Sequence, residues 1–225
     1  MIVPDLIERS NRKTLSLSVM KDGAIIVKAP LSMQESVINK FIEEKQNWIK
    51  EKLAIVNKTN NKFEDVIKYK SFLLYGNKYS LVLGDVKKIE TNDNFQIVMP
   101  RNIEQDKVLK QLKAWYKKVA KKILQDRLKF VEERIRLKSN AMRINDSKGR
   151  WGSCNTRGVI SFNWRVILLP PQIIDYVIVH ELCHLIEMNH SKKFWELVQR
   201  FLPSFANSKK AIKEYGILLS LYRDK

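Results

Sequence analysis

The sequence predicts an α+β fold, and three features point to it. Residues 14–29 and 72–84 alternate apolar and polar side chains on either side of turn-forming residues, which is typical of β-hairpins. Residues 104–137 keep the apolar spacing of a long amphipathic helix. A second group of strands follows this helix, and further helices follow those strands. We therefore expect a β-rich N-terminal region with one amphipathic helix at residues 1–103, and the long helix with a second α+β region at 104–225.

The N-terminal region is predicted to begin with a hairpin and a helix. Lys21-Asp22-Gly23 supplies the turn of the hairpin. Ser32 and Glu35 have the spacing of a capping box, after which apolar residues keep a helical period to about residue 56. We expect the polar segment 57–62 to be a loop.

Strands are predicted on both sides of the long helix. Gly76-Asn77 supplies the turn of the second hairpin, and residues 94–99, NFQIVM, form a further strand before a proline. After the helix, residues 141–146 and 158–169 are expected to be strands, separated by the Gly-rich turn KGRWGSCNTRG.

The long helix carries much of the positive charge. Residues 104–138 hold twelve Lys or Arg and five Asp or Glu, so this segment supplies +7 of the net charge of +18. Its predicted apolar face consists of Val108, Leu112, Trp115, Val119, Ile123, Val131 and Ile135. The lysines elsewhere on the helix either form a solvated surface or bind a polyanion such as DNA or RNA.

Three helices are predicted to follow the second group of strands. Pro170-Pro171 opens a helix that keeps its period through Met188, and Asn189 can end it. A helix from Ser191 to Phe201 follows, and a last one begins after Asn207.

The composition is that of a globular protein. With 225 residues, 26.5 kDa and 44% hydrophobic residues, the chain can bury a core. The first residues lack the pattern of a signal peptide, and no apolar run is long enough to span a membrane, so we expect a cytoplasmic protein with no membrane partner. Two cysteines are too few for a disulfide framework. Nothing in the sequence indicates an oligomeric state.

All three histidines of the chain lie within HELCHLIEMNH, residues 180–190. His180 and His184 are four residues apart, so on a helix both imidazoles project from one face and can bind one ion. His190 follows the predicted helix end and can supply a third ligand, which leaves one position open for water. Two histidines can also lie on a solvated helix surface, but the apolar neighbours place this helix in the interior. We therefore predict a Zn²⁺ site.

Glu181 is the candidate catalytic base. It follows the first ligand, in the position from which an HExxH carboxylate reaches a zinc-bound water rather than the ion. Deprotonation of this water and proton transfer to a leaving amine would amount to metal-assisted amide hydrolysis. Because zinc would occupy the histidines, the oxyanion would be stabilised by zinc, a backbone N–H, or a side chain such as Asn163, Arg165 or Tyr176.

Two neighbours of the histidines have alternative roles. Cys183 lies as close to the His180/His184 face of the helix as Glu181 does, so it is either a thiolate ligand or a packed thiol. Glu187 is either a surface carboxylate or a group that orients a ligand histidine.

Three segments together resemble a known family. RWGSC at 150–154, GVISFNWRVILLP at 158–170 and VIVHELCHLIEMNHSKKFW at 177–195 are similar to the YgjP-like metallopeptidases, which resemble the SprT and WLM zinc proteases in their zincin site. The resemblance is dense over residues 147–198 and extends to the N-terminal hairpin. It implies a zincin-like metallopeptidase domain of the α+β class, with the HExxH helix beside a mixed sheet, that hydrolyses a protein or peptide substrate.

The resemblance also suggests where the substrate binds. The ISFNW strand is expected beside the active-site helix, where the unpaired backbone groups of an edge strand could bind an extended peptide. Trp151, Asn163 and Arg165 are candidate substrate-binding residues, and Gly152 is either a turn residue or part of the cleft. The SprT and WLM relatives act on proteins attached to DNA, and a charge of +18 is compatible with a substrate bound to nucleic acid.

Two other functions are compatible with the histidine spacing. Zinc endoribonucleases of ribosomal RNA maturation resemble the pattern HGxLHLxGxDH, which has glycine where this chain has Glu181. Alternatively, the protein binds nucleic acid and its zinc is structural, in which case a fourth protein ligand such as Cys183 would be expected. The glutamate and the flanking motifs favour the peptidase.

Overall fold

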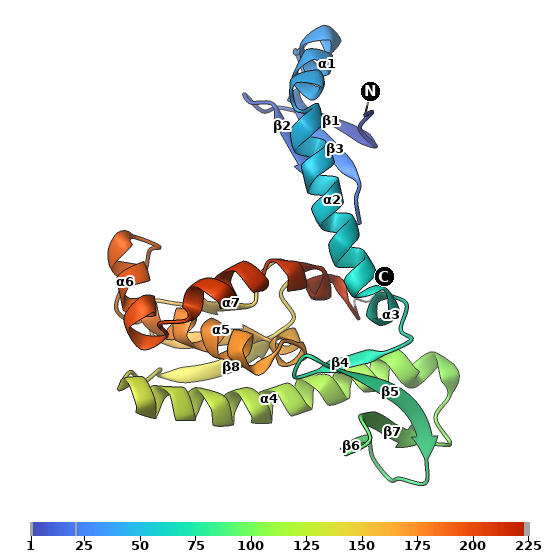
Figure 1. The fold of residues 1–225 in the computed structure, drawn as a ribbon, viewed down its shortest axis with the longest axis vertical. Helices are drawn as coiled ribbons and strands as arrows, with labels where there is room; N and C mark the ends of the chain where they lie inside the picture. The colour runs from blue at the N-terminus through green and yellow to red at the C-terminus, as the bar shows by residue number, and fades with distance from the viewer. Residues whose placement is uncertain (1, 21, 223–225) are drawn as a thin grey trace. The chain divides into compact units, whose positions relative to one another are not determined.

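The computed structural model describes residues 2–20 and 22–222, and Figure 1 shows their fold. The chain forms two compact units, Met1–Glu64 and Asp65–Lys225, so the division falls at a different place from that between the predicted regions 1–103 and 104–225. The predicted α+β class is confirmed, because both units combine helices with a mixed sheet. No helix among the described residues is long and apolar enough to cross a membrane.

A three-stranded sheet forms one layer of the first unit. β3 (Ile25–Pro30) lies in the centre, antiparallel to β2 (Ser16–Val19) and parallel to β1 (Leu6–Ser10). The predicted hairpin of β2 and β3 is therefore confirmed, although Lys21 of its turn lies outside the described residues. β1 was not predicted, since its sequence LIERS does not alternate and the strand is largely exposed.

Two helices cover this sheet in place of the one that was predicted. α1 (Glu35–Glu44) and α2 (Gln46–Lys62) are separated at Lys45. The predicted capping box is not formed, because the helix begins after Gln34 and no side chain caps it. The predicted loop at 57–62 is instead the last part of α2. The core cluster between this sheet and the helices is aliphatic and consists of Ile25, Val27, Ala29, Ile38, Ile42 and Ile49.

The second unit contains a four-stranded sheet in the order β4-β5-β7-β6. The bounds of its strands are β4 (Phe72–Leu74), β5 (Asn77–Gly84), β6 (Glu90–Asn92) and β7 (Gln96–Pro100), and the short helix α3 (Glu64–Ile67) precedes them. The predicted hairpin of β4 and β5 and the strand β7 are confirmed, whereas β6 was not predicted.

The turn between β4 and β5 fixes this sheet to residues 167–170. Tyr75 N and Gly76 N donate hydrogen bonds to the carbonyls of Ile167 and Leu168, at 2.8 and 3.2 Å. Gly76 has a φ of +78°, and a Cβ there would lie 2.8 Å from the Pro170 ring. Glycine is therefore required both by the backbone conformation and by the close approach.

α4 (Val108–Ile135) is the long helix, preceded by the 3₁₀ turn η1 (Gln105–Lys107). It ends at Arg136, which adopts the left-handed conformation. Its buried residues are Leu112, Tyr116, Ala120, Leu124, Leu128, Val131 and Ile135. The helix is thus confirmed, but Trp115, Val119 and Ile123 of the predicted apolar face are only partly buried.

A three-stranded sheet follows α4. β10 (Val159–Asn163) lies in the centre, parallel to β8 (Ala141–Asn145) and antiparallel to β9 (Gly152–Cys154). β9 lies within the segment that was predicted to be a turn. The predicted strand at 158–169 is shorter than expected, because residues Trp164–Leu168 form the 3₁₀ turn η2.

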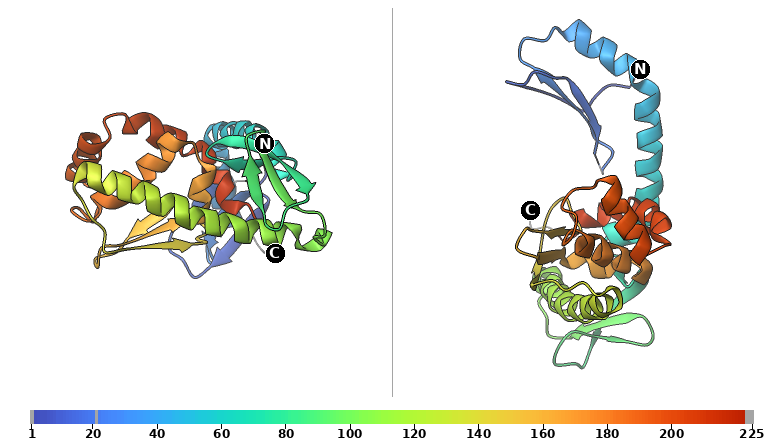
Figure 2. Two further views of the ribbon diagram at one scale, coloured as in Figure 1. Left: turned by 90° about the horizontal axis from the view of Figure 1, so that it is seen from below. Right: turned by 90° about the vertical axis from the view of Figure 1, so that its left-hand side faces the viewer.

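α5 (Pro171–Cys183) occupies the middle of the second unit. It contacts α4, β9, α6 (Lys192–Phe201) and α7 (Phe205–Ala211), and it lies between α4 and the C-terminal helices in Figures 1 and 2. α5 ends earlier than the predicted Met188, and α7 begins before Asn207. The 3₁₀ segment η3 (Glu214–Ser220) follows.

Candidate active site

The three histidines converge at the C-terminal end of α5. His180 lies in its last turn, His184 is its C-cap, and His190 lies just before α6. One ligand atom from each imidazole can be chosen so that all three lie within 4.8 Å of one another, and the Nε2 atoms of His180 and His190 are 3.0 Å apart. The helix therefore ends where the chain must turn to bring His190 back.

The segment between α5 and α6 is held by short-range contacts. Asn189 Oδ1 accepts a hydrogen bond from Ser191 N at 2.9 Å, and the Ser191 hydroxyl caps α6 by accepting one from Phe194 N at 3.3 Å. The Phe194 ring stacks on the His184 ring, with centroids 4.5 Å apart, and packs edge-on against His190 at 4.8 Å. These contacts position His190 relative to the helix.

The tautomer of His184 is fixed by a backbone group. Its Nδ1 lies 3.0 Å from the carbonyl oxygen of Glu187, so Nδ1 carries the proton and Nε2 keeps its lone pair. Glu187 thus orients a predicted ligand, but through its backbone carbonyl. The sequence suggested the carboxylate for this role.

The donor set fits a divalent metal ion. Ligands bound tetrahedrally to zinc at about 2.0–2.1 Å lie about 3.3 Å apart, close to the 3.0 Å between His180 and His190. Burial lowers the pKa of His180 to about 3, helped by the charges of His184, His190 and Lys209, and burial also lowers the pKa of His190. Both imidazoles are therefore neutral at physiological pH, which is the form that binds metal.

Glu181 points from α5 toward β9. Its side chain is buried, and burial raises its pKa to about 8 although Arg150 acts to lower it. A Cβ on Gly152 would lie 2.5 Å from Glu181 Oε1 and 2.7 Å from its Cγ. Gly152 is therefore required by the close approach of strand and carboxylate, which explains this part of the RWGSC motif.

The histidines and Glu181 share one cleft of about 460 Å³. Its lining residues come from the loop before β9, from β9 itself, from α5 and the turn after it, and from the end of α7. They are Arg150, Trp151, Gly152, Ser153, Cys154, Tyr176, Val177, His180, Glu181, His184, Met188, His190 and Ile212. Arg150, Ser153, Cys154 and Ile212 were not predicted as cleft residues, although three of them lie within or next to the WGSC motif.

Tyr176 lines the cleft one helical turn before His180. Its ring packs edge-on against the His180 ring, with centroids 5.8 Å apart. Burial raises the pKa of Tyr176 to about 12, and the nearby Glu181 adds to the rise, so the phenol is a neutral O–H donor at physiological pH.

Asn163 and Arg165 do not line the cleft, which corrects the sequence prediction of substrate contact for these two residues. Both side chains are fully buried. Asn163 Nδ2 donates to the carbonyls of Ser147 and Arg150 at 2.7 and 3.3 Å. Arg165 donates to the carbonyl of Leu221 and forms an ion pair with Asp146. Since these groups are used in the interior, they position the loop that leads to β9; Trp151, the third candidate, does line the cleft.

Asp146 anchors that loop. Burial acts to raise its pKa, but hydrogen bonds from Arg165, Lys117 and Trp164 outweigh burial and hold the pKa well below its usual range. The carboxylate is therefore charged at any physiological pH and keeps its partners.

Cys183 is a packed thiol. Its side chain is fully buried, and burial raises the pKa of the thiol to about 12. It is not part of the group formed by His180, His184 and His190 among the described residues. The alternative of a thiolate ligand, and with it a closed structural site, has no support in this geometry.

The edge strand beside the active-site helix is β9, which corrects the expectation for the ISFNW strand. β10, which contains ISFN, is paired on both sides. Among the strands of the described residues, β9 pairs with β10 alone, and its residues line the cleft. The unpaired backbone groups next to Glu181 therefore belong to Gly152–Cys154.

Comparisons with known proteins give the family of this chain. No curated protein matches the sequence. Among solved structures, the crystal structure of the metallopeptidase zymogen of Pyrococcus abyssi abylysin matches with 22% identity and a TM-score of 0.37, over 45% of this chain and 97% of that one. The family model "YgjP-like, metallopeptidase domain" matches residues 13–215. Because this match covers most of the 225 residues, the chain belongs to the YgjP-like family of metallopeptidases.

Proposed function

We propose that the protein is a zinc-dependent peptidase that cleaves peptide bonds with Glu181 as general base. The observation that carries this proposal is the shared cleft, in which three convergent imidazoles lie beside one buried carboxylate. Zinc is the ion that a set of three histidines with an open position typically binds for hydrolysis.

His180, His184 and His190 would hold the ion. When bound, zinc would polarise the substrate carbonyl and acidify water. Glu181 would take the proton of the attacking water and pass it to the leaving amine, so that one residue acts as base and then as acid. Its position next to β9 supports this role, because the carboxylate borders the place where substrate backbone would lie.

The substrate would bind as an extended strand along β9. The free edge of Gly152–Cys154 faces the cleft and offers backbone donors and acceptors to a peptide. Such recognition uses hydrogen bonds to the backbone of the substrate. An unfolded segment is therefore a better substrate than a folded one, because its backbone groups are free to pair.

Tyr176 would donate to the oxyanion. Of the three side chains that the sequence suggested for this task, it is the one that lines the cleft. A preorganised O–H next to the reacting carbonyl is worth about 10²–10³ in rate. Tyr176→Phe should therefore lower kcat with little change in KM or zinc content.

Nucleic acid is a proposed partner that would bring protein substrates close. Exposed lysines of α4 outside the hollows beside this helix support this part of the proposal: Lys110, Lys121 and Lys129. Lys113 and Lys117 are not included, because both form ion pairs with Asp146, which anchors the loop before β9.

The decisive experiment compares wild type, Glu181→Gln and His184→Ala for metal content and for cleavage of an unfolded protein such as reduced casein. We expect stoichiometric zinc in wild type and Glu181→Gln, cleavage by wild type alone, and neither zinc nor cleavage in His184→Ala. Cleavage by Glu181→Gln at the wild-type rate would remove the general base from the mechanism.

A parallel assay with and without single-stranded DNA tests the partner. The same proteins are also tested for cleavage of RNA. Zinc in wild type and Glu181→Gln, together with cleavage of RNA and no cleavage of protein by wild type, would instead support the endoribonuclease alternative.

A further inference from the structure

α4 presents a second apolar stripe away from the catalytic cleft. Trp115, Val119 and Ile123 follow one another at four-residue intervals, so they form one line along the helix. They lie beside the buried face rather than on it, and each remains partly exposed. A helix whose second apolar stripe is only partly covered by its own chain has surface available for a partner.

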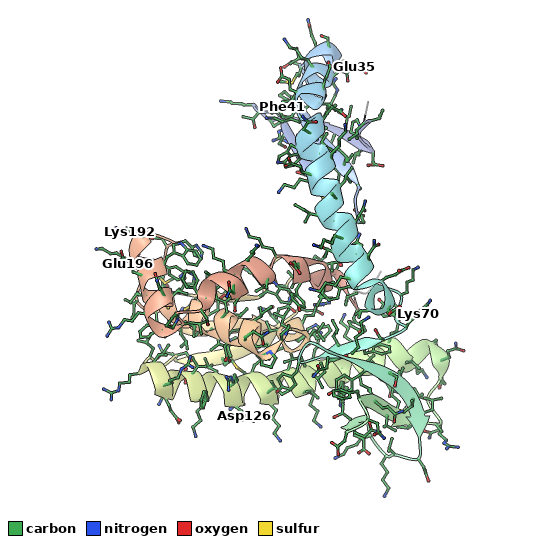
Figure 3. The ribbon with its side chains drawn as sticks, in the orientation of Figure 1. Glu35, Phe41, Lys70, Asp126, Lys192 and Glu196 are labelled. Atoms are coloured by element: carbon green, nitrogen blue, oxygen red, sulfur yellow. The ribbon has the colours of Figure 1, made fainter. Side chains whose placement is uncertain are left out.

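The stripe forms the floor of a groove. Ile89 and Lys88, from the loop between β5 and β6, form the opposite wall of a hollow of about 560 Å³. A second hollow of about 730 Å³ shares Trp115, Val119, Lys122 and Ile123 with the first, so the two are continuous along the helix. Asp126, labelled in Figure 3, belongs to the second hollow and lies on the side of α4 away from α5.

The charge of the groove changes along its length. Lys88, Lys118 and Lys122 line the first hollow, and all three are exposed. Among the described residues, that lining includes no Asp or Glu. The second hollow is lined by Glu90 and Asp126 together with Arg127 and Lys122. An occupant of the first hollow must therefore combine apolar side chains with negative charge.

We propose that this groove, the α4 groove, docks a segment of a partner protein that is acidic and carries aliphatic or aromatic side chains. Apolar side chains would fill the hollow over Val119, Ile123 and Ile89, and flanking carboxylates would pair with the three lysines. Such complementarity gives specificity and speeds association.

Two other occupants fit the groove less well. A second copy of this chain would bring a net charge of +18 against a lysine-lined surface, and like charges repel. Single-stranded nucleic acid binds through stacked aromatic platforms, whereas Trp115 is the one aromatic ring among the described residues that line the lysine-rich first hollow.

The test is a binding titration followed by fluorescence anisotropy, with the full-length protein and a labelled synthetic peptide that alternates Glu with Leu and Phe. Two control peptides replace Glu by Lys, or Leu and Phe by Ser. We expect saturable binding of the first peptide, which weakens with salt, and no binding of either control. Equal binding of the Ser-containing peptide would overturn the proposal, because it would show attraction of any polyanion.

Paired variants locate the site. Lys118→Glu/Lys122→Glu should raise Kd by about tenfold, since two attractive pairs become repulsive. Lys121→Glu/Lys129→Glu changes the charge equally on the same helix but outside the groove, and should leave Kd within about twofold. Equal weakening by both pairs would contradict a docking site in the α4 groove.

An apolar pair completes the design. Ile123→Ser should abolish peptide binding, whereas Leu109→Ser, at an exposed position of α4 outside the groove, should not. If the protein self-associates and Ile123→Ser abolishes this, the groove binds a second copy of the chain. If an oligodeoxynucleotide binds at the same residues more tightly than the acidic peptide, the groove binds nucleic acid. Either result would replace the proposal. Cleavage of reduced casein by these variants is measured separately, so failure of the docking proposal and failure of the proposed peptidase are distinguishable.

Discussion

The core of the first unit and the core around α5 differ in the types of side chain that they bury. The first is aliphatic throughout, from Ile25 to Ile49. The second contains buried polar side chains, and those of the described residues are Asn163, Arg165, Glu181, His184 and Ser208. Burying a polar group costs free energy unless it finds partners, so a chain keeps such groups where they line a site or hold the segments that form it. Buried polarity therefore distinguishes the catalytic part of the molecule from the supporting part.

Removal of the buried cation should have the largest effect on stability. Arg165→Met leaves the Leu221 carbonyl without its donor and takes from Asp146 its buried partner, although Lys113, Lys117 and Trp164 remain. Removing one member of a buried pair costs at most about 3–5 kcal/mol. Urea denaturation measures the loss. A cost below about 1 kcal/mol would mean that the two groups are solvated in the folded protein.

Gly152→Ala tests how tightly β9 and the base are packed. The added Cβ would overlap the Glu181 carboxylate, which has to move. A displacement of about 1 Å at a catalytic group lowers the rate by about 10²-fold. Steady-state cleavage kinetics should show this fall in kcat, while zinc content, measured by atomic absorption, stays at the wild-type level.

In the metal-free protein, the contribution of Glu181 to stability should fall as pH rises. Glu181 keeps its proton in the folded state up to a pKa of about 8, whereas an unfolded Glu loses it near about 4.3. At this side chain the unfolded state therefore binds fewer protons between these values, and the contribution of Glu181 to the free energy of unfolding decreases with pH.

Glu181→Gln removes this dependence. Denaturation after chelation should show the variant more stable than wild type near pH 8, and the difference should vanish near pH 4. An unchanged difference across this range would show that Glu181 does not titrate with the raised pKa.

A conservative change in the aliphatic core should have the smallest effect. Ile49→Val removes one buried methyl group and should cost about 0.5–1.5 kcal/mol. Zinc content and kcat should not change, because the described residues that line the cleft all belong to the second unit. A loss of zinc in this variant would contradict the separation of the two cores.

The long helix shows where sequence patterns stop being decisive. Its apolar residues form two adjacent stripes, one through Tyr116, Ala120 and Leu124 and one through Trp115, Val119 and Ile123. Helical periodicity fits both, so it predicts the helix without saying which stripe is buried. Tertiary packing buries the first stripe, in which Tyr116 stacks on Trp164 and donates a hydrogen bond to the Leu73 carbonyl at 2.9 Å.

Asn163 and Arg165 show the same limit for the site. Their polar types next to the HExxH helix suggested contact with substrate, but their partners are the carbonyl groups of residues 147, 150 and 221 and the carboxylate of Asp146. These partners are distant in sequence from the two side chains. No local pattern could indicate them.

The sequence by itself determined the α+β class, the metal-ligand spacing of His180, His184 and His190, and the position of Glu181. These features depend on helical geometry over a few residues, which local sequence specifies. Tertiary structure alone decided that β9 is the free edge, that Gly152 must lack a side chain beside Glu181, and that α4 buries one stripe fully and the other only in part. Each of these depends on contacts between segments far apart in the chain, where space and hydrogen-bond partners are set by the packing of the whole unit.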